Sequence, residues 1–364
     1  HQLVSMRVPS HAAVGTTVEL VRAGVGERPV RLVNAVLRRV AEHDLAGWMS
    51  RLAPDPDQDP IGHLAVTHAH PRWIVEELLR VLDDLDQVAT VLAADNVAPE
   101  VTLVTRPGLS EPADLLARHG TQVRPGLWSP YAAILESGDP GGFDEVRAGR
   151  VGIQDEGSQL VTLALARAAV TGRDTQWLDL CAGPGGKATL LTGLARERGA
   201  TLIANERFPH RAALVRAGLR GYGPPSTVVC GDGTHPPWQP HTFDRVLVDA
   251  PCSGLGALRR RPESRWRRTP ADVVNLVPLQ HALLNSALDS TRPGGVVAYV
   301  TCSPHCDETR GVVDDVLAAR SDVIEEDARD LLPEVGDVGA GPSVQLWPHV
   351  HGTDAMFLAV LRRS

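Results

Sequence analysis

Residues 178–187 read Leu-Asp-Leu-Cys-Ala-Gly-Pro-Gly-Gly-Lys, a short apolar strand that runs into a glycine-rich turn. Glycine lets the backbone approach a ligand closely, and the helix expected after the turn offers free N–H groups in its first residues. The turn alone does not distinguish a binding loop from a tightly packed one. As a binding loop it suits NAD, FAD or S-adenosylmethionine, and its candidate residues are Cys181, Ala182, Gly183, Pro184, Gly185, Gly186 and Lys187.

Strand-like and helical segments alternate from about residue 155 onward, which predicts an α/β domain built on a parallel, doubly wound sheet. Asp155 is expected to cap a helix that runs to about residue 169. Such sheets bind ligands outside the carboxyl ends of their strands. The predicted strands are residues 177–180, 201–204, 227–229, 245–248, 296–300 and 356–361.

Carboxylates follow the second and third of these strands. Glu206 is placed to accept hydrogen bonds from both hydroxyls of a ribose, although an isolated Glu there is also typical of a helix cap. Asp232 could accept from an adenine amino group, or it could be a turn residue.

Two cysteines follow the fourth and fifth strands. The fourth leads into Asp-Ala-Pro-Cys-Ser-Gly at 249–254, and the fifth into Thr-Cys-Ser-Pro at 301–304. A free cysteine is usually a small buried apolar residue. Two of them at adjacent strand ends, one preceded by Asp249, are harder to explain as packing, and we expect Cys252 and Cys302 to face one cleft.

These segments together resemble the RNA cytosine-5 methyltransferases of the Sun/Fmu (RsmB) group. The resemblance is strong over 151–364 and includes the Gln-Asp pair at 154–155 and the closing Gly-Thr-Asp at 352–354. Residues 73–150 resemble the small α+β module that precedes the catalytic domain. Residues 1–52 resemble part of an all-α NusB-like RNA-binding region, and because the chain starts with His1 we expect upstream sequence to be missing. Thr309 stands where the family has asparagine, which we expect to loosen a local hydrogen bond.

The resemblance implies a Rossmann-like class I S-adenosylmethionine-dependent methyltransferase domain. Cys302 matches the family's nucleophile and Cys252 the cysteine linked to release of the product. Asp249 would hold the base, and Lys187 would favour anionic forms of its neighbours. The cofactor site would consist of the 181–187 loop with Glu206, Asp232 and Asp249. The expected substrate is RNA, most naturally 16S rRNA of the small subunit, with tRNA as the alternative.

The formal charge of the chain is −8, so any RNA-binding face must be local. One basic stretch fits, and Trp266 within it is a candidate for stacking on a base. The alternative is a solvated surface loop. The arginines of this basic stretch are Arg259, Arg260, Arg261, Arg265, Arg267 and Arg268.

Lys187 is the sole lysine among 36 basic residues, which indicates a place where a compact ammonium is required. The five cysteines are odd in number and no secretion signal accompanies them, so we expect neither disulfides nor a metal site. No apolar run is long enough to span a membrane, and we expect a cytoplasmic monomer.

The sequence is also compatible with three other functions. A DNA cytosine-5 methyltransferase would attack with Cys252 instead of Cys302. A nicotinamide dehydrogenase would use the glycine loop and Glu206 but leave both thiols idle. A non-catalytic RNA-binding or ribosome-assembly factor with a vestigial methyltransferase domain would need neither thiol.

Overall fold

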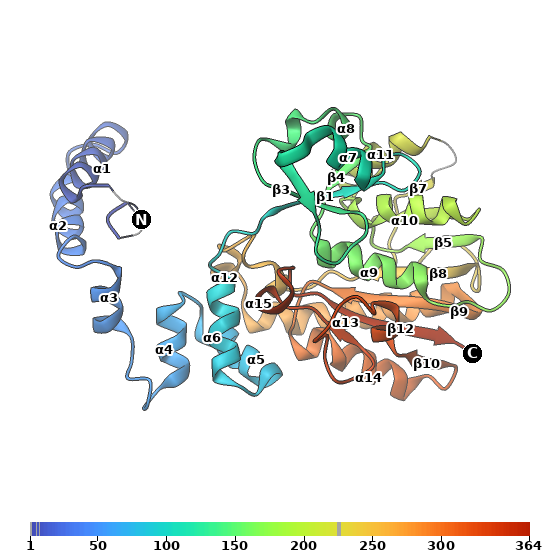
Figure 1. The fold of residues 1–364 in the computed structure, drawn as a ribbon. Helices are drawn as coiled ribbons and strands as arrows, with labels where there is room; N and C mark the ends of the chain where they lie inside the picture. The colour runs from blue at the N-terminus through green and yellow to red at the C-terminus, as the bar shows by residue number, and fades with distance from the viewer. Residues whose placement is uncertain (1, 5, 7, 224–226) are drawn as a thin grey trace. The chain divides into compact units, whose positions relative to one another are not determined.

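The computed structural model describes residues 2–4, 6, 8–223 and 227–364 (Figure 1). The chain divides into two compact units, His1–Val75 and Glu76–Ser364. Among the described residues, no helix is long and apolar enough to cross a membrane.

The first unit is helical. Asp44 and Asp59 cap its third and fourth helices by accepting hydrogen bonds from Gly47 N and Gly62 N. The fourth helix begins at Pro60, after a segment rich in proline and aspartate. The helices are α1 (Ser10–Gly24), α2 (Val30–Val40), α3 (Leu45–Leu52), α4 (Pro60–Thr67) and the start of α5 (Arg72–Leu82).

A small antiparallel sheet lies near the start of the second unit, in the strand order β2-β3-β1-β4. Its last strand begins at Val151, where we expected the catalytic domain to start, and pairs with β1. The elements of this region are α6 (Leu85–Ala94), β1 (Val101–Thr105), α7 (Pro112–His119), β2 (Val123–Pro125), β3 (Ala132–Leu135), α8 (Asp144–Arg147) and β4 (Val151–Ile153).

The large sheet has the order β10-β12-β9-β8-β5-β6-β7, with β11 paired to β12. The strands from β9 to β7 are parallel, as predicted, whereas β12 pairs antiparallel with β9 and β10 antiparallel with β12. The sheet is therefore mixed, which corrects the wholly parallel prediction. The strands are β5 (Gln176–Asp179), β6 (Thr201–Asn205), β7 (Thr227–Val229), β8 (Phe243–Asp249), β9 (Thr291–Thr301), β10 (Val323–Glu326), β11 (Val344–Gln345) and β12 (Phe357–Arg363).

Helices cover both faces of this sheet (Figure 1). Asp155 caps the first of them through its carboxylate and Gly157 N, at 2.9 Å, as predicted. The helices are α9 (Glu156–Arg167), α10 (Gly186–Glu197), α11 (Pro209–Leu219), α12 (Ser264–Arg267), α13 (Pro270–Ser290), α14 (Arg310–Ala319) and α15 (Pro348–His351).

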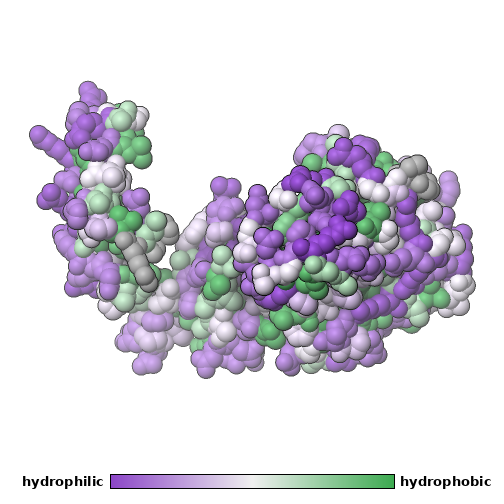
Figure 2. Space-filling view, turned by 45° about the horizontal axis from the view of Figure 1, so that its top comes forward, coloured by the Kyte–Doolittle hydropathy of each residue, from purple (hydrophilic) through white to green (hydrophobic). Residues whose placement is uncertain are grey.

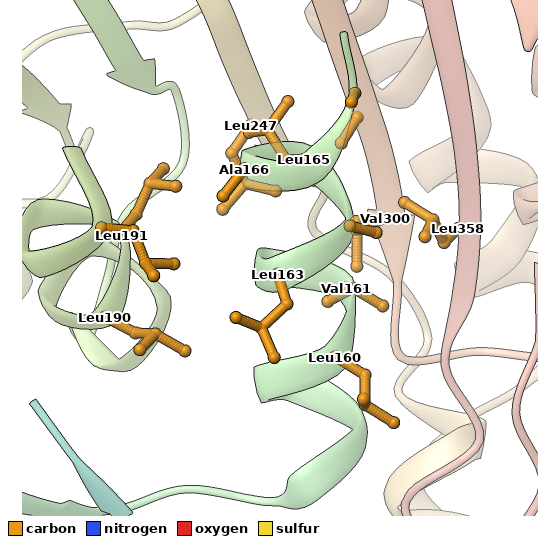
Figure 3. Packing of buried hydrophobic residues seen from close by; sticks show 14 of the residues in the cluster. Leu160, Val161, Leu163, Leu165, Ala166, Leu190, Leu191, Leu247, Val300 and Leu358 are labelled. Carbon is orange, nitrogen blue, oxygen red and sulfur yellow. The ribbon is translucent and has the colours of Figure 1, made fainter. Parts of the chain in front are cut away.

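The larger hydrophobic core lies between α9, α10 and one face of the sheet. In Figure 3, Leu163 of α9 points toward Leu190 and Leu191 of α10, and Val161 lies on the side of Val300. All of these side chains are at most 3 % exposed. A fully buried Leu or Val stabilises the fold by about 1.5–3 kcal/mol, so this helix fixes the strand ends on which the site is built. On the face shown in Figure 2, hydrophilic side chains separate small hydrophobic areas.

Candidate active site

A cavity of about 570 Å³ opens at the carboxyl ends of the parallel strands. This is the edge at which doubly wound sheets bind their ligands. It brings together side chains from five strand ends that are far apart in the sequence. Its lining includes the predicted residues Cys181, Gly183, Lys187, Glu206, Asp232, Asp249, Cys252 and Cys302.

The glycine-rich loop joins β5 to α10 beside this cavity. Gly185 has a φ of +116°, a conformation that L side chains rarely adopt. A Cβ on Gly183 would meet Glu206 Oε2, so a larger residue there would displace this carboxylate. Gly183 N instead donates a hydrogen bond to that oxygen at 3.0 Å. Gly185 therefore supplies the backbone conformation of the loop, and Gly183 leaves room for Glu206.

Glu206 is 4 % exposed, and its Oε1 accepts a hydrogen bond from Phe208 N at 2.9 Å. Near it, Asn205 Oδ1 in the cavity lining is a buried acceptor without a hydrogen-bond partner among the described residues. Buried acceptors are rarely left unpaired unless a ligand or water completes them. S-adenosylmethionine presents donors of the matching kind in its ribose hydroxyls, adenine amino group and ammonium, so the residues present fit this cofactor.

Asp232 is mainly a turn residue. Its Oδ1 accepts from Thr234 N at 3.0 Å and from Thr234 Oγ1 at 2.7 Å, and these bonds lower the pKa of its carboxyl group. Its Oδ2 lies 3.8 Å from Arg207 Nη2. Asp232 lines the cavity, but its carboxylate already has partners, whereas Asn205 Oδ1 has none among the described residues.

Lys187, in the first turn of α10, forms an ion pair with Asp249 at the end of β8. The Nζ–Oδ2 distance is 2.9 Å, and the Lys187 side chain is 12 % exposed. Burial disfavours the ammonium, but the charge and hydrogen bond of Asp249, together with the charges of Cys302 and Asp179, outweigh it and raise the pKa of Lys187. The lysine is therefore a fixed positive charge in the cavity wall.

The two thiols lie next to this ion pair, with Cys252 Sγ 3.3 Å from Cys302 Sγ. A hydrogen bond from Cys252 lowers the pKa of Cys302, and the charge of Lys187 adds to this effect. The same bond, together with burial, raises the pKa of Cys252. Of the two thiols, Cys302 is therefore the one that ionises more readily, and a thiolate is the reactive form of cysteine.

A third thiol, Cys181, also lines the cavity. Burial raises the pKa of Cys181 well above its ordinary value, and the neighbouring carboxylate of Asp179 acts in the same direction. Cys181 therefore stays protonated, which distinguishes it from Cys302.

The sequence model of the family 16S rRNA methyltransferase RsmB/F matches residues 168–362, and that of the NusB family matches residues 1–42. The chain belongs to the RsmB/F family. The methyltransferase fold and the methyl donor, S-adenosylmethionine, are confirmed, as is the NusB-like N-terminus.

The chain is 52 % identical to the Mycobacterium tuberculosis protein Rv1407, which is named as a methyltransferase, over all of this chain and 79 % of that protein. It is 34 % identical to ribosomal RNA small subunit methyltransferase B of Sodalis glossinidius, over 99 % of this chain and 78 % of that protein. It is 32 % identical to ribosomal RNA small subunit methyltransferase B of Vibrio cholerae, over 100 % of this chain and 79 % of that protein. This RsmB/F member is therefore an S-adenosylmethionine-dependent RNA methyltransferase.

Solved structures support the fold. The crystal structure of PH0851 has a TM-score of 0.80 at 20 % identity and covers 99 % of this chain and 78 % of that one. NSun6 of Pyrococcus horikoshii, solved with the S-adenosylmethionine analogue SFG, has a TM-score of 0.69 at 16 % identity, over 81 % and 99 %.

The predicted arginine cluster of this methyltransferase is split, which corrects its interpretation as one RNA-binding stretch. Arg259 and Arg260 both pair with Asp155 and Asp354, at N–O distances from 2.6 to 2.9 Å. Arg265 is 3 % exposed and donates to Asn96 Oδ1 at 2.8 Å. These three arginines hold segments of the fold together. The others are Arg261 and Arg267, which are exposed, and Arg268, which is half-buried; Trp266 among them is 64 % exposed.

At Thr309, where we expected a loosened hydrogen bond, the hydroxyl donates to His305 O at 2.8 Å and the residue is 4 % exposed, so threonine supplies one hydrogen bond to this turn. The residue before it, Glu308, was not predicted to belong to the site. It is fully buried and contacts the segments that carry both thiols. An acidic residue in a loop gives no pattern from which its burial could be read.

The structure shows no metal centre among the residues it describes: no group of three His, Cys, Asp or Glu side chains there is placed to hold an ion. His305, between Cys302 and Cys306, instead lies with its Nδ1 3.3 Å from Glu77 Oε1.

Proposed function

We propose that this methyltransferase modifies carbon 5 of a cytosine in small-subunit rRNA through a covalent bond between Cys302 and carbon 6 of the base. The observation that carries the proposal is the pair of thiols, 3.3 Å apart, beside the Lys187–Asp249 ion pair. Methylation at nitrogen or oxygen needs no thiol. Carbon 5 of cytosine is a poor nucleophile and needs one.

Addition of the Cys302 thiolate to carbon 6 makes carbon 5 an enamine carbon that can accept a methyl group. The hydrogen bond from Cys252 and the charge of Lys187 favour that thiolate before the base arrives. Bound S-adenosylmethionine supplies the electrophilic methyl group. The residues that would hold it are the 181–187 loop and Glu206, beside the unpaired acceptor of Asn205.

Asp249 is the group we assign to the N3 edge of the base, where charge develops as the sulfur adds. After methylation, carbon 5 carries both a methyl group and a proton. Removal of that proton restores the carbon 5–carbon 6 double bond and breaks the sulfur–carbon 6 bond. Cys252, next to the sulfur that must leave, is placed to serve this release.

The two cysteines can be tested separately. Cys302→Ala should form no adduct and transfer no methyl group, while still binding S-adenosylmethionine. Cys252→Ala should attack but stall before release, and so accumulate a protein–RNA adduct that survives denaturation and migrates slowly in a gel. The exposed cysteine Cys230 is the matched control, because Cys230→Ala should turn over normally. If Cys302→Ala traps RNA and Cys252→Ala does not, the roles are reversed and Cys252 attacks as in DNA cytosine-5 methyltransferases.

The substrate is tested independently by bisulfite sequencing of total RNA from cells with and without the gene. Loss of a protected cytosine in 16S rRNA supports the proposal. Loss in tRNA only would move the substrate to tRNA. Unchanged protection everywhere, with a protein that still binds RNA, would favour a non-catalytic ribosome-assembly factor.

A further inference from the structure

Glu308 is a fully buried carboxylate next to the thiol pair, outside the lining of the cavity. Its Oε1 accepts from Ser253 N at 2.7 Å and from Gln280 Nε2 at 3.0 Å. Its Oε2 accepts from Ser253 Oγ at 2.5 Å and from Ser303 Oγ at 2.7 Å. Four hydrogen bonds to one buried charge are costly to rearrange, so this carboxylate is a rigid point in the structure.

The donors belong to the two segments that carry the thiols. Ser253 follows Cys252 after β8, and Ser303 follows Cys302 after β9. The two hydroxyls also contact each other, at 3.1 Å. Gln280 of α13 extends the same group, since its Nε2 donates to Pro251 O at 2.9 Å as well. One carboxylate therefore ties the loop before and after Cys252 to the loop of Cys302.

Glu308 is itself fixed from behind. The hydroxyl of Tyr299, on β9, donates to Glu308 O at 2.8 Å, and Glu308 N donates to His305 O at 3.0 Å. The buried hydroxyl of Thr309 closes the same turn. The backbone of Glu308 is therefore held in place, and its carboxylate fixes the loops of Cys252 and Cys302 relative to each other.

We infer that Glu308 is a positioning residue that selects Cys302, rather than Cys252, as the thiolate of the pair. It acts in two ways. It holds the two sulfur atoms 3.3 Å apart, within hydrogen-bond distance of each other. The hydrogen bond to Cys302 and burial raise the pKa of Cys252 most, and the charge of Glu308 acts in the same direction, which disfavours a thiolate there. This inference rests on the proposed function, in which Cys302 attacks and Cys252 serves release.

The test uses the whole protein without RNA or cofactor. Iodoacetamide reacts with thiolates, and tandem mass spectrometry separates alkylation at Cys302 from that at Cys252 across a pH series. The native protein should be alkylated mainly at Cys302. Glu308→Gln should lower the ratio of Cys302 to Cys252 labelling at pH 7 by roughly tenfold, the change expected when the two pKa values approach each other by about one pH unit.

A milder variant guards against a folding defect. Ser303→Ala removes one of the four hydrogen bonds and should lower the ratio roughly threefold, in keeping with the loss of one hydrogen bond. The matched control is Asp244→Asn, which disrupts another fully buried carboxylate at the opposite end of β8. This control should lose stability without changing the ratio, so a general effect of destabilisation is separated from positioning.

Each outcome decides a different point. An unchanged ratio in folded Glu308→Gln and Ser303→Ala overturns the positioning role, whatever happens to stability. The same is true of an equal change in Asp244→Asn. Preferential labelling of Cys252 in the native protein would instead overturn the assignment of Cys302 in the proposed function, before any Glu308 variant is considered.

Discussion

The two edges of the parallel strands differ in how they hold a buried carboxylate. At the amino end, Asp244 is fully buried and accepts hydrogen bonds from Thr175 N at 2.7 Å and Gln176 N at 2.8 Å. The side chains of Arg173 and Arg292 also donate to it. Burial alone would raise the pKa of Asp244, but these hydrogen bonds lower it. Both carboxylate oxygens of Asp244 are therefore hydrogen-bonded within the protein.

At the carboxyl end, the polar groups are only partly used. Asp249 has its partner in Lys187, but Asp179 at the end of the neighbouring β5 has a buried oxygen without one among the described residues. Burial raises the pKa of Asp179 to about 8, and the charge of Asp249 contributes. Unsatisfied acceptors and raised pKa values cost stability, and they cluster where a ligand completes them. The difference between the ends separates a structural carboxylate from a functional one.

The largest effect on stability is expected at the structural end. Asp244→Asn removes the charge and faces an NH₂ group toward donors, leaving buried donors unpaired. We expect the free energy of unfolding to fall by about 3 kcal/mol, measured by urea denaturation. Asp144→Asn is the control, since Asp144 is an 80 % exposed partner of Arg147 and surface pairs contribute little. A loss below that of the control would show that Asp244 is not structural.

At the functional end, Asp179→Asn should raise the free energy of unfolding, in contrast to Asp244→Asn, and the increase should depend on pH. The folded protein keeps a proton on Asp179 up to about pH 8, whereas the unfolded chain releases it near pH 4. Between these values the folded state binds more protons, so this group lowers the stability of the native protein as pH rises. The advantage of Asp179→Asn should grow by roughly 1.4 kcal/mol per pH unit inside that window. Melting curves at pH 5 and pH 8 measure it, and an advantage independent of pH would mean that Asp179 is already ionised.

The sequence predicted the central strands because buried parallel strands are apolar runs followed by glycine-rich turns. β7 was predicted at its observed bounds, and β5, β6 and β8 within two residues. β10 and β11 were missed, because Val323–Glu326 and Val344–Gln345 are short and partly polar. Their pairing with β12 depends on contacts that no local pattern encodes.

The site shows the same limit. Lys187, Asp249 and the thiols could be singled out because each follows a predicted strand, and strand ends meet at one edge of the sheet. The same reasoning could not distinguish structural from functional charged side chains in loops. Arg259 and Arg261 are two positions apart in one basic run, yet the first is held by two carboxylates and the second is exposed. Only the fold decides which arginine meets a buried partner.

Glu206→Ala tests whether the functional end binds the cofactor through its strand-end carboxylates. Removing the carboxylate leaves Gly183 N without its partner and removes an acceptor from the cavity. We expect binding of S-adenosylmethionine, measured by isothermal titration, to weaken by about 1–3 kcal/mol. Glu197→Ala, on the same unit but outside the cavity lining, is the control. An unchanged dissociation constant would remove Glu206 from the cofactor site.

The smallest effect is expected from two arginines of the basic stretch, and it extends the comparison to cations. Arg261 and Arg268 line the cavity, and within the part of the chain that the structure describes neither forms an ion pair like those of Arg260 with Asp155 and Asp354. Replacing both with alanine should lower affinity alike for RNAs of different sequence. It should also flatten the dependence of log affinity on log salt by roughly 1.4, the value for two phosphate contacts to a single strand.

Arg260→Ala should instead lower the melting temperature and leave the salt slope unchanged, because its partners are Asp155 and Asp354. Filter binding across a salt series measures both slopes. If affinity at low salt is unchanged in the Arg261/Arg268 double variant, these arginines belong to a solvated loop, and RNA must approach the cavity over another surface.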